Sequence, residues 1–218
     1  ASSGEWKAMV ADEAARTTFA KNIKTVLEKN KLDGIDLDFE WAENEKEYED
    51  YSLAILKMRE MLGDKYLFSV SLHPVCYKIS KEAIEAVDFI SLQCYGPSPV
   101  RFPIEKYCSD IQMVLEYGIP KEKLVAGVPF YGVTKDNSKK TEAYFNFVQN
   151  GLVTSPAQNE VIYQGDTYVF DGQDNIRIKT RYAKEQKLKG MMSWDLATDL
   201  PLSDSRSLLK TMTEELRE

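Results

Sequence analysis

The stretch that decides the fold reads Leu32-Asp33-Gly34-Ile35-Asp36-Leu37-Asp38-Phe39-Glu40-Trp41. Its three acids, Asp36, Asp38 and Glu40, alternate with three large apolar residues. In an extended strand, successive side chains point to opposite faces of the sheet. The stretch therefore predicts a strand over residues 33–40, with three carboxyl groups on one face and three apolar side chains on the other.

Three carboxyl groups on one strand face repel one another and are costly to desolvate, so some of them must be protonated or paired. Such a face is suited to proton transfer, but two other interpretations fit the spacing. The face is simply solvated, or its carboxylates bind magnesium or calcium. A zinc or iron site is disfavoured because the chain has a single histidine, His73.

The composition is that of a folded globular chain. It has 218 residues, of which 43% are hydrophobic and 29% charged, and a net charge of -7. An acidic chain without clustered Lys and Arg argues against a nucleic-acid partner. No apolar run approaches the roughly 20 residues of a membrane span. The three cysteines lack metal-ligand spacing, and no linker interrupts the chain, so we predict one domain over residues 1–218.

Helix and strand patterns alternate along the chain. Helical spacing of apolar residues predicts helices at 12–30, 45–62, 80–86, 104–117, 142–150 and 203–217, and another that Asp174 or Asn175 caps and that runs to Lys187. Short apolar runs predict parallel strands at 33–40, 66–72, 87–95, 124–131 and 189–195, and antiparallel strands near 160–164 and 167–170.

Parallel strands joined by helices are typical of an open doubly wound sheet or of a closed (β/α)₈ barrel. The doubly wound sheet requires a glycine-rich phosphate loop at an early turn, and the sequence has none. The barrel carries polar residues at the carboxyl ends of its strands. Four of the five parallel strands end in this way, at Glu40, His73, Tyr95 and Trp194. We therefore predict an α/β fold of the TIM-barrel type.

Residues 33–40 resemble the signature of glycoside hydrolase family 18, which includes chitinases and endo-β-N-acetylglucosaminidases. Residues 124–132 resemble the seventh strand of that family and residues 190–195 its eighth, while Gln93-Cys94-Tyr95 lies where the family carries a tyrosine on strand six. The resemblance makes the acidic strand the fourth of eight. The chain is then expected to cover strands four to eight, with the first three strands of the barrel upstream of Ala1.

The resemblance implies hydrolysis of β-1,4 bonds next to N-acetylglucosamine, with retention, by a mechanism in which the substrate assists. Glu40 would be the general acid and then the base for water. Asp38 would orient the acetamido group and stabilise the positive oxazolinium, while Asp36 would share a proton with Asp38. Tyr95 would donate a hydrogen bond to the acetamido oxygen.

The resemblance also implies a sugar-binding surface, in which Trp194 forms the floor. Gln93 is a further substrate-binding candidate, and Tyr131 and Trp41 either contact the sugar or pack in the core. His73 is interpreted as a structural residue. The implied partner is an N-acetylglucosamine-containing polysaccharide or glycan in the extracellular space or cell envelope, with no cofactor and no metal ion.

Two departures from the family pattern affect the expected substrate. Gly96 stands where many members carry an Asp or Asn that helps to bind the sugar. The segment 132–168 is short for the α+β subdomain that walls the cleft of processive chitinases, which predicts a shallow groove and endo action. Cleavage of the chitobiose core of N-glycans and non-catalytic sugar binding are the alternatives. Retention of Glu40 argues against the latter, and the oligomeric state stays open.

Overall fold

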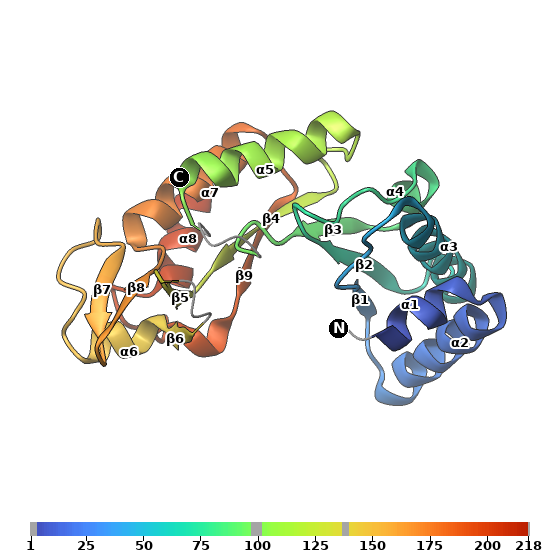
Figure 1. Cartoon of the computed structure of the whole chain (residues 1–218), viewed down its shortest axis with the longest axis horizontal. Coiled ribbons are helices and arrows are strands. Elements are labelled where there is room, and N and C mark those ends of the chain that lie inside the picture. Colours follow the sequence, from blue (N-terminus) through green and yellow to red (C-terminus); the bar gives the residue numbers. More distant parts are fainter. Residues whose placement is uncertain (1–3, 97–101, 137–139, 218) are drawn as a thin grey trace. The chain divides into compact units, whose positions relative to one another are not determined.

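The computed structural model describes residues 4–96, 102–136 and 140–217. These residues belong to two compact units. The first comprises residues 1–92 and 114–124, and the second comprises residues 93–113 and 125–218. Each unit contains parallel strands connected through helices (Figure 1), which fits a TIM-barrel-like fold. Within the described ranges, no helix is both long enough and apolar enough to cross a membrane.

The first unit is built on three neighbouring parallel strands, β1 (Gly34–Asp38), β2 (Leu67–Leu72) and β3 (Phe89–Leu92). Four helices belong to it: α1 (Gly4–Ala11), α2 (Glu13–Asn30), α3 (Glu45–Leu62) and α4 (Lys81–Ala86). The side chains of Asp12, Asn44 and Ser80 each accept a hydrogen bond from the backbone N–H three residues later. These N-caps satisfy donors that a helix leaves unpaired at its start. The helices predicted at 12–30, 45–62 and 80–86 are confirmed.

The apolar face of β1 packs against α3. Leu37 and Phe39 are almost completely buried, and the Phe39 ring centroid lies 4.9 Å from that of Tyr51. The Tyr51 hydroxyl donates to the Leu37 carbonyl at 3.1 Å, which anchors the strand to the helix. Asp36, on the opposite parity, is exposed. The predicted alternation is therefore confirmed, but the strand ends at Asp38, earlier than residue 40.

The second unit combines a parallel strand pair with a small antiparallel sheet. Strand β4 (Leu124–Pro129) pairs in parallel with β9 (Gly190–Trp194). The antiparallel sheet has the order β6 (Thr141–Ala143), β5 (Tyr131–Thr134), β8 (Asp166–Val169) and β7 (Glu160–Tyr163). The helices are α6 (Tyr144–Gln149), α7 (Gln173–Glu185) and α8 (Leu208–Arg217), and α5 (Ile104–Tyr117) contributes residues to both units. The helix predicted at 142–150 and the antiparallel strands predicted near 160–164 and 167–170 are confirmed, whereas β5 and β6 are additional strands.

Two predicted strands are too long at their carboxyl ends. The strand predicted at 124–131 ends at Pro129, and Tyr131 instead begins β5 in the antiparallel sheet. The strand predicted at 87–95 ends at Leu92, so Gln93 and Tyr95 follow the strand rather than lie in it. In both cases the apolar run continues past the last residue of the ladder, because residues in a buried loop are as apolar as those in a buried strand.

Two predicted helix starts are wrong. Gly172, not Asp174 or Asn175, is the N-cap residue of α7. The Asp174 side chain accepts from Arg177 and the Asn175 side chain donates to Asp171, so neither caps the backbone of the helix. Helix α8 begins at Leu208 rather than near residue 203. The Asp199 carboxylate accepts from the backbone N–H groups of Leu208 and Leu209 at 2.9 and 2.8 Å, so the helix starts where this cap lies.

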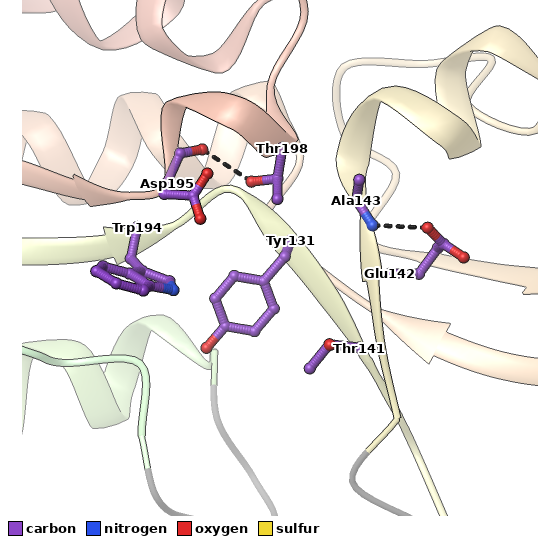
Figure 2. Close-up of a pocket in the computed structure, with 7 residues that line it drawn as sticks. All are labelled: Tyr131, Thr141, Glu142, Ala143, Trp194, Asp195 and Thr198. Atoms are coloured by element: carbon purple, nitrogen blue, oxygen red, sulfur yellow. Dashed lines mark hydrogen bonds between the residues drawn. The ribbon is translucent and has the colours of Figure 1, made fainter. Parts of the chain in front are cut away.

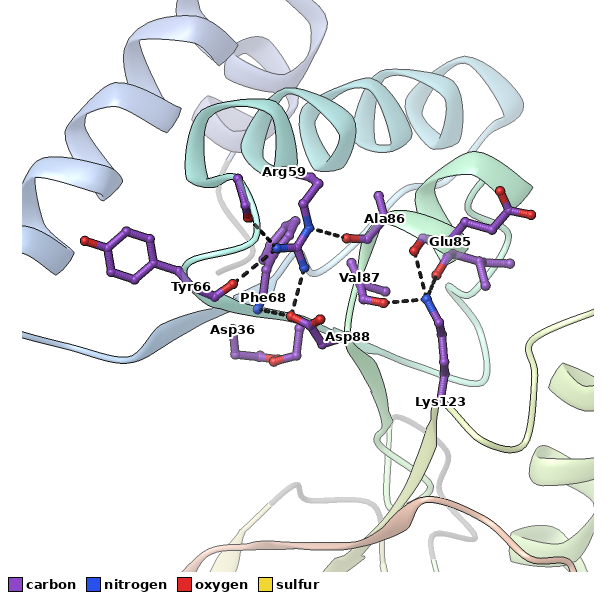
Figure 3. Close-up of polar contacts among 12 residues, drawn as sticks. Asp36, Arg59, Tyr66, Phe68, Glu85, Ala86, Val87, Asp88 and Lys123 are labelled. Carbon is purple, nitrogen blue, oxygen red and sulfur yellow. Dashed lines mark hydrogen bonds and ion pairs between the residues drawn. The ribbon is translucent and has the colours of Figure 1, made fainter.

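A polar network connects the loops before β2, β3 and β4 in the first unit (Figure 3). Arg59 on α3 donates to the carbonyls of Ala86 and Tyr66 and pairs with Asp88 at 2.8 Å. Lys123 Nζ donates to three carbonyls around the carboxyl end of α4, at distances of 2.6 to 3.0 Å. These cations satisfy carbonyl groups that a helix leaves unpaired at its end.

Lys123→Met should lower the free energy of unfolding by about 1–2 kcal/mol, because it removes charge-assisted hydrogen bonds to three carbonyls. Urea unfolding followed by circular dichroism measures the change. The matched control is Lys121→Met, two residues earlier at an exposed position, for which we expect a change below about 0.5 kcal/mol. Equal losses in the two variants would contradict the assigned role of Lys123.

Candidate active site

The first unit holds the acidic ladder. Asp36 and Asp38 share one face of β1, and in the parallel register they lie beside Ser69 and Ser71 of β2. The Ser69 hydroxyl donates to Asp36 Oδ1 at 2.6 Å and the Ser71 hydroxyl donates to Asp36 Oδ2 at 2.7 Å. Both oxygens of the Asp36 carboxyl group therefore accept hydrogen bonds from side chains of the neighbouring strand.

Asp38 occupies a different electrostatic environment from Asp36. Burial raises the pKa of Asp38 above its ordinary value, and the negative charges of Glu40 and Asp36 raise it further, while His73 opposes the increase. A half-buried acid among other acids holds a proton more tightly than an acid in water. Asp38 therefore keeps its proton to a higher pH than an aspartic acid in water does.

Glu40 lies two residues beyond the last residue of β1, and 29% of its side chain is exposed. Its Oε1 atom is 3.2 Å from Nε2 of His73, whose side chain is almost buried. The His73 ring also meets the Trp41 ring edge to face, with centroids 4.5 Å apart. Glu40 is thus oriented by a histidine and remains accessible to solvent.

A tight turn after β2 holds His73 in place. The backbone groups of His73 and Cys76 exchange two hydrogen bonds, of 3.2 and 2.8 Å. The Cys76 sulfur in turn accepts from the backbone N–H of Ala42 at 3.3 Å, so the turn is bonded to the loop that follows Glu40. This arrangement fixes the distance between the histidine and the glutamate from both sides.

The second unit holds the other candidate residues, beginning with those after β3. Gln93 and Tyr95 are buried, and the Tyr95 hydroxyl donates to Gln93 Oε1 at 3.2 Å. The same hydroxyl lies 3.8 Å from the sulfur of Met192 on β9. Tyr95 packs edge to face with Tyr131, the first residue of β5, with ring centroids 6.4 Å apart.

A pocket of about 300 Å³ lies beside Tyr131 in the second unit (Figure 2). It is lined by Tyr131, Thr141, Glu142, Ala143, Trp194, Asp195 and Thr198. Trp194 is the last residue of β9 and is 57% exposed, so its ring is available for contact with a ligand. Asp195 accepts from the backbone N–H of Ala197 at 2.7 Å and so caps the short helix η1 (Leu196–Thr198) that borders the pocket.

The sequence-predicted residues thus fall into two sets. The first unit contains Asp36, Asp38, Glu40 and Trp41, and the second unit contains Gln93, Tyr95, Tyr131 and Trp194. Among the residues that the structure describes, no group of three or more His, Cys, Asp or Glu side chains is arranged to hold a metal ion.

Sequence reasoning missed three residues that contact the acids. The sequence analysis treats His73 as a structural residue and does not anticipate its contact with Glu40. Ser69 and Ser71 bind Asp36 and were not singled out, although they alternate along the strand 66–72 just as Asp36 and Asp38 do along theirs. That shared period of two was a signal that the hydroxyls and the acids lie on the same side of the sheet.

Comparisons with known proteins agree on one family. The family model for glycosyl hydrolases family 18 matches residues 1–199. The probable chitinase 2 of Drosophila melanogaster is 24% identical over 261 aligned positions, which cover 90% of this chain and 54% of that protein. The chain spans only 39–65% of the length of the first curated relatives that it matches.

Solved structures show the same fold. The family 18 chitinase ChiB of Flavobacterium johnsoniae is 26% identical, with a TM-score of 0.80, over 96% of this chain and 68% of that chain. The chitinase-like agglutinin RobpsCRA of Robinia pseudoacacia is 19% identical, also with a TM-score of 0.80, over 96% of this chain and 75% of that chain. With a family model that covers residues 1–199 of 218, the chain belongs to glycosyl hydrolases family 18.

Proposed function

We propose that this chain is an endo-acting glycosidase that cleaves β-1,4 bonds next to N-acetylglucosamine in chitin or chitooligosaccharides, outside the cell or in the cell envelope. Family membership supports a hydrolase of this class. The observation that carries the proposal is the partly exposed Glu40 carboxyl group at the end of an acidic ladder, held 3.2 Å from His73 Nε2. A general acid needs this combination of fixed orientation and access to the leaving oxygen.

The proposed reaction proceeds in two steps with retention. In the first step Glu40 protonates the glycosidic oxygen, the bond from that oxygen to the anomeric carbon breaks, and the 2-acetamido oxygen of the substrate bonds to the same carbon. In the second step Glu40 removes a proton from water, which attacks the anomeric carbon and opens the oxazolinium ring. The proton lost by Glu40 in the first step is thereby restored.

Asp38 and Asp36 have different proposed roles. Asp38 accepts a hydrogen bond from the acetamido N–H and, as negative charge, stabilises the oxazolinium cation. Its raised pKa supports a proton shared with Asp36 in the resting ladder, because a shared proton relieves the repulsion between neighbouring carboxylates. The hydroxyl groups of Ser69 and Ser71 hold the Asp36 carboxyl group in place beside Asp38.

The aromatic residues of the second unit are proposed to bind the sugar. Trp194 offers an exposed ring for stacking on the sugar face, beside Tyr131. Tyr95 is proposed to donate to the acetamido oxygen. Because its hydroxyl donates to Gln93 Oε1 in the free protein, substrate must replace this hydrogen bond. Gln93 is proposed as a further sugar-binding residue.

The test is incubation with N,N′,N″,N‴-tetraacetylchitotetraose, followed by proton NMR of the anomeric signals. We expect the β-anomer of the product to form first, because the second displacement restores the original configuration. Initial formation of the α-anomer would contradict the mechanism. Incubation with a high-mannose glycoprotein separates chitin cleavage from action on the chitobiose core of N-glycans.

A second candidate function is sugar binding without cleavage. The fold similarity to the chitinase-like agglutinin of Robinia pseudoacacia supports it. The two candidates differ in their outcome with chitotetraose: a binding protein gives a measurable Kd by calorimetry but no product after prolonged incubation. Glu40 favours the hydrolase, because binding alone does not require an oriented, accessible acid.

A further inference from the structure

A fully buried ion pair lies in the second unit and has no part in the proposed reaction. Lys179 on α7 and Asp171 have side chains that are 1% and 0% exposed, and Nζ lies 2.5 Å from Oδ2. Lys179 Nζ also donates to the backbone carbonyl of Phe102 at 2.8 Å and lies 5.5 Å from the centroid of the Tyr107 ring. Asp171 Oδ1 accepts from the side chain of Asn175 at 3.1 Å.

A buried ion pair adds little, on balance, to the free energy of unfolding. Removing two charges from water is costly, and apolar residues of similar volume often serve a folded protein equally well. What apolar residues cannot do is donate a hydrogen bond to a buried carbonyl. The contact of Lys179 with the Phe102 carbonyl, on a residue 77 positions earlier in the chain, is therefore the feature that needs explanation.

Phe102 connects this carbonyl to the candidate sugar-binding residues. Its ring is buried in one cluster with Tyr95 and Val133, and Tyr131 packs against that cluster. The Phe102 and Tyr131 ring centroids are 5.9 Å apart and the rings are nearly perpendicular. A shift of the Phe102 backbone would therefore move the Phe102 ring, and with it the Tyr95 and Tyr131 rings that pack around it, because close-packed interiors transmit displacement.

We propose that the Asp171–Lys179 pair positions Phe102, and through its ring holds Tyr95 and Tyr131 in the geometry that binds the sugar. The inference rests on the proposed function of the two tyrosines. Both charged residues are positioning residues, since beyond each other they contact Phe102, Tyr107 and Asn175. Preorganised contacts of this kind affect kcat/KM because small misplacements of binding groups are costly.

The experiment is a mutant cycle on the 218-residue chain, with chitotetraose as the substrate. The first variant, Asp171→Asn/Lys179→Met, removes both charges together, so that no single charge is left buried and unpaired. The second variant, Phe102→Leu, removes the ring and leaves the pair. The third combines the two. Each is measured for kcat and KM and for urea unfolding.

We expect each of the first two variants to lower kcat/KM about tenfold, mainly through an increase in KM. The combined variant should lose no more kcat/KM than the more impaired of the two. Changes that act through one ring do not add. The matched control is Arg181→Met on the same helix, which breaks the pair with Glu215 at 2.8 Å and should change stability but not KM. Additive losses, or an unchanged KM in the first variant, would overturn the proposal.

One further measurement, made without substrate, separates failure of the proposed function from failure of this inference. If the wild-type chain cleaves nothing, the proposed function fails, but NMR signals of ¹³C-labelled tyrosine rings still report on Tyr95 and Tyr131 without substrate. These signals should shift in the pair variant and in Phe102→Leu, and stay in place in Arg181→Met. If the pair variant does not fold, Phe102→Leu alone carries the test, and unchanged ring signals together with an unchanged KM would refute the inference.

Discussion

Glu40→Gln should lower the kcat for chitotetraose by about 10³-fold, within the range of about 10²–10⁴ that general acid–base catalysis supplies. Glutamine has nearly the shape of glutamate and can still contact His73 Nε2, so the geometry of the site is preserved. It cannot protonate the leaving oxygen or remove a proton from water. Steady-state kinetics measures the loss, and calorimetry with the intact oligosaccharide should give a Kd within about threefold of the wild type.

The control for this variant is Glu43→Gln, the same chemical change three residues later. Glu43 is exposed and pairs with Lys7 at 2.7 Å, so its loss should cost little in stability and nothing in turnover. A kcat that is unchanged in Glu40→Gln would remove Glu40 from its role as the acid. A loss of both kcat and binding would instead indicate that the substitution disturbs the loop next to Trp41.

The fold could be predicted from the sequence where one physical pattern dominates. The alternation along β1 and the helical spacing in α3 are both local, and each agrees with the burial of the same residues. Strand ends were harder to predict, because buried apolar residues such as Cys94 and Phe130 follow after the ladder has ended. The strand boundary depends on pairing with distant segments, which a local pattern does not contain.

The candidate site shows the same division. The acids Asp38 and Glu40 were found from their own spacing in the sequence. The partner of Glu40 was not, because His73 comes 33 residues later and reaches the acid only when β1 and β2 pair in parallel. A role that depends on a tertiary contact can be predicted from the sequence only when the register between the strands can be inferred. The sequence analysis did not infer the register that places Ser69 and Ser71 beside the acids.

Asp38→Asn should lower kcat about 10²-fold, because the proposed oxazolinium cation loses the charge that stabilises it. The same change should make the folded protein more stable at neutral pH. Burial raises the pKa of Asp38, and Glu40 raises it further, so the folded chain favours the protonated form more strongly than the unfolded chain does. An ionised Asp38 therefore opposes folding, and Asn removes that cost.

The stability gain should depend on pH in a definite direction. Below about pH 3 the carboxyl group is neutral in both the folded and the unfolded chain, so Asn replaces a neutral group and the gain is absent. As the pH rises through the raised pKa of Asp38, the wild type alone becomes less stable, so the gain should increase and then level off above that pKa. Urea unfolding of both proteins across this range measures the difference.

The matched control for the pH series is Asp33→Asn, an exposed position of opposite parity just before β1. It should leave kcat unchanged. Suppose instead that Asp38→Asn lowers the free energy of unfolding more at pH 7 than at pH 3. The ionised Asp38 carboxylate would then be stabilised by favourable contacts in the folded protein. Asp38 would then be a structural anchor of the ladder, and the repulsion that makes the ladder useful for proton transfer would be absent.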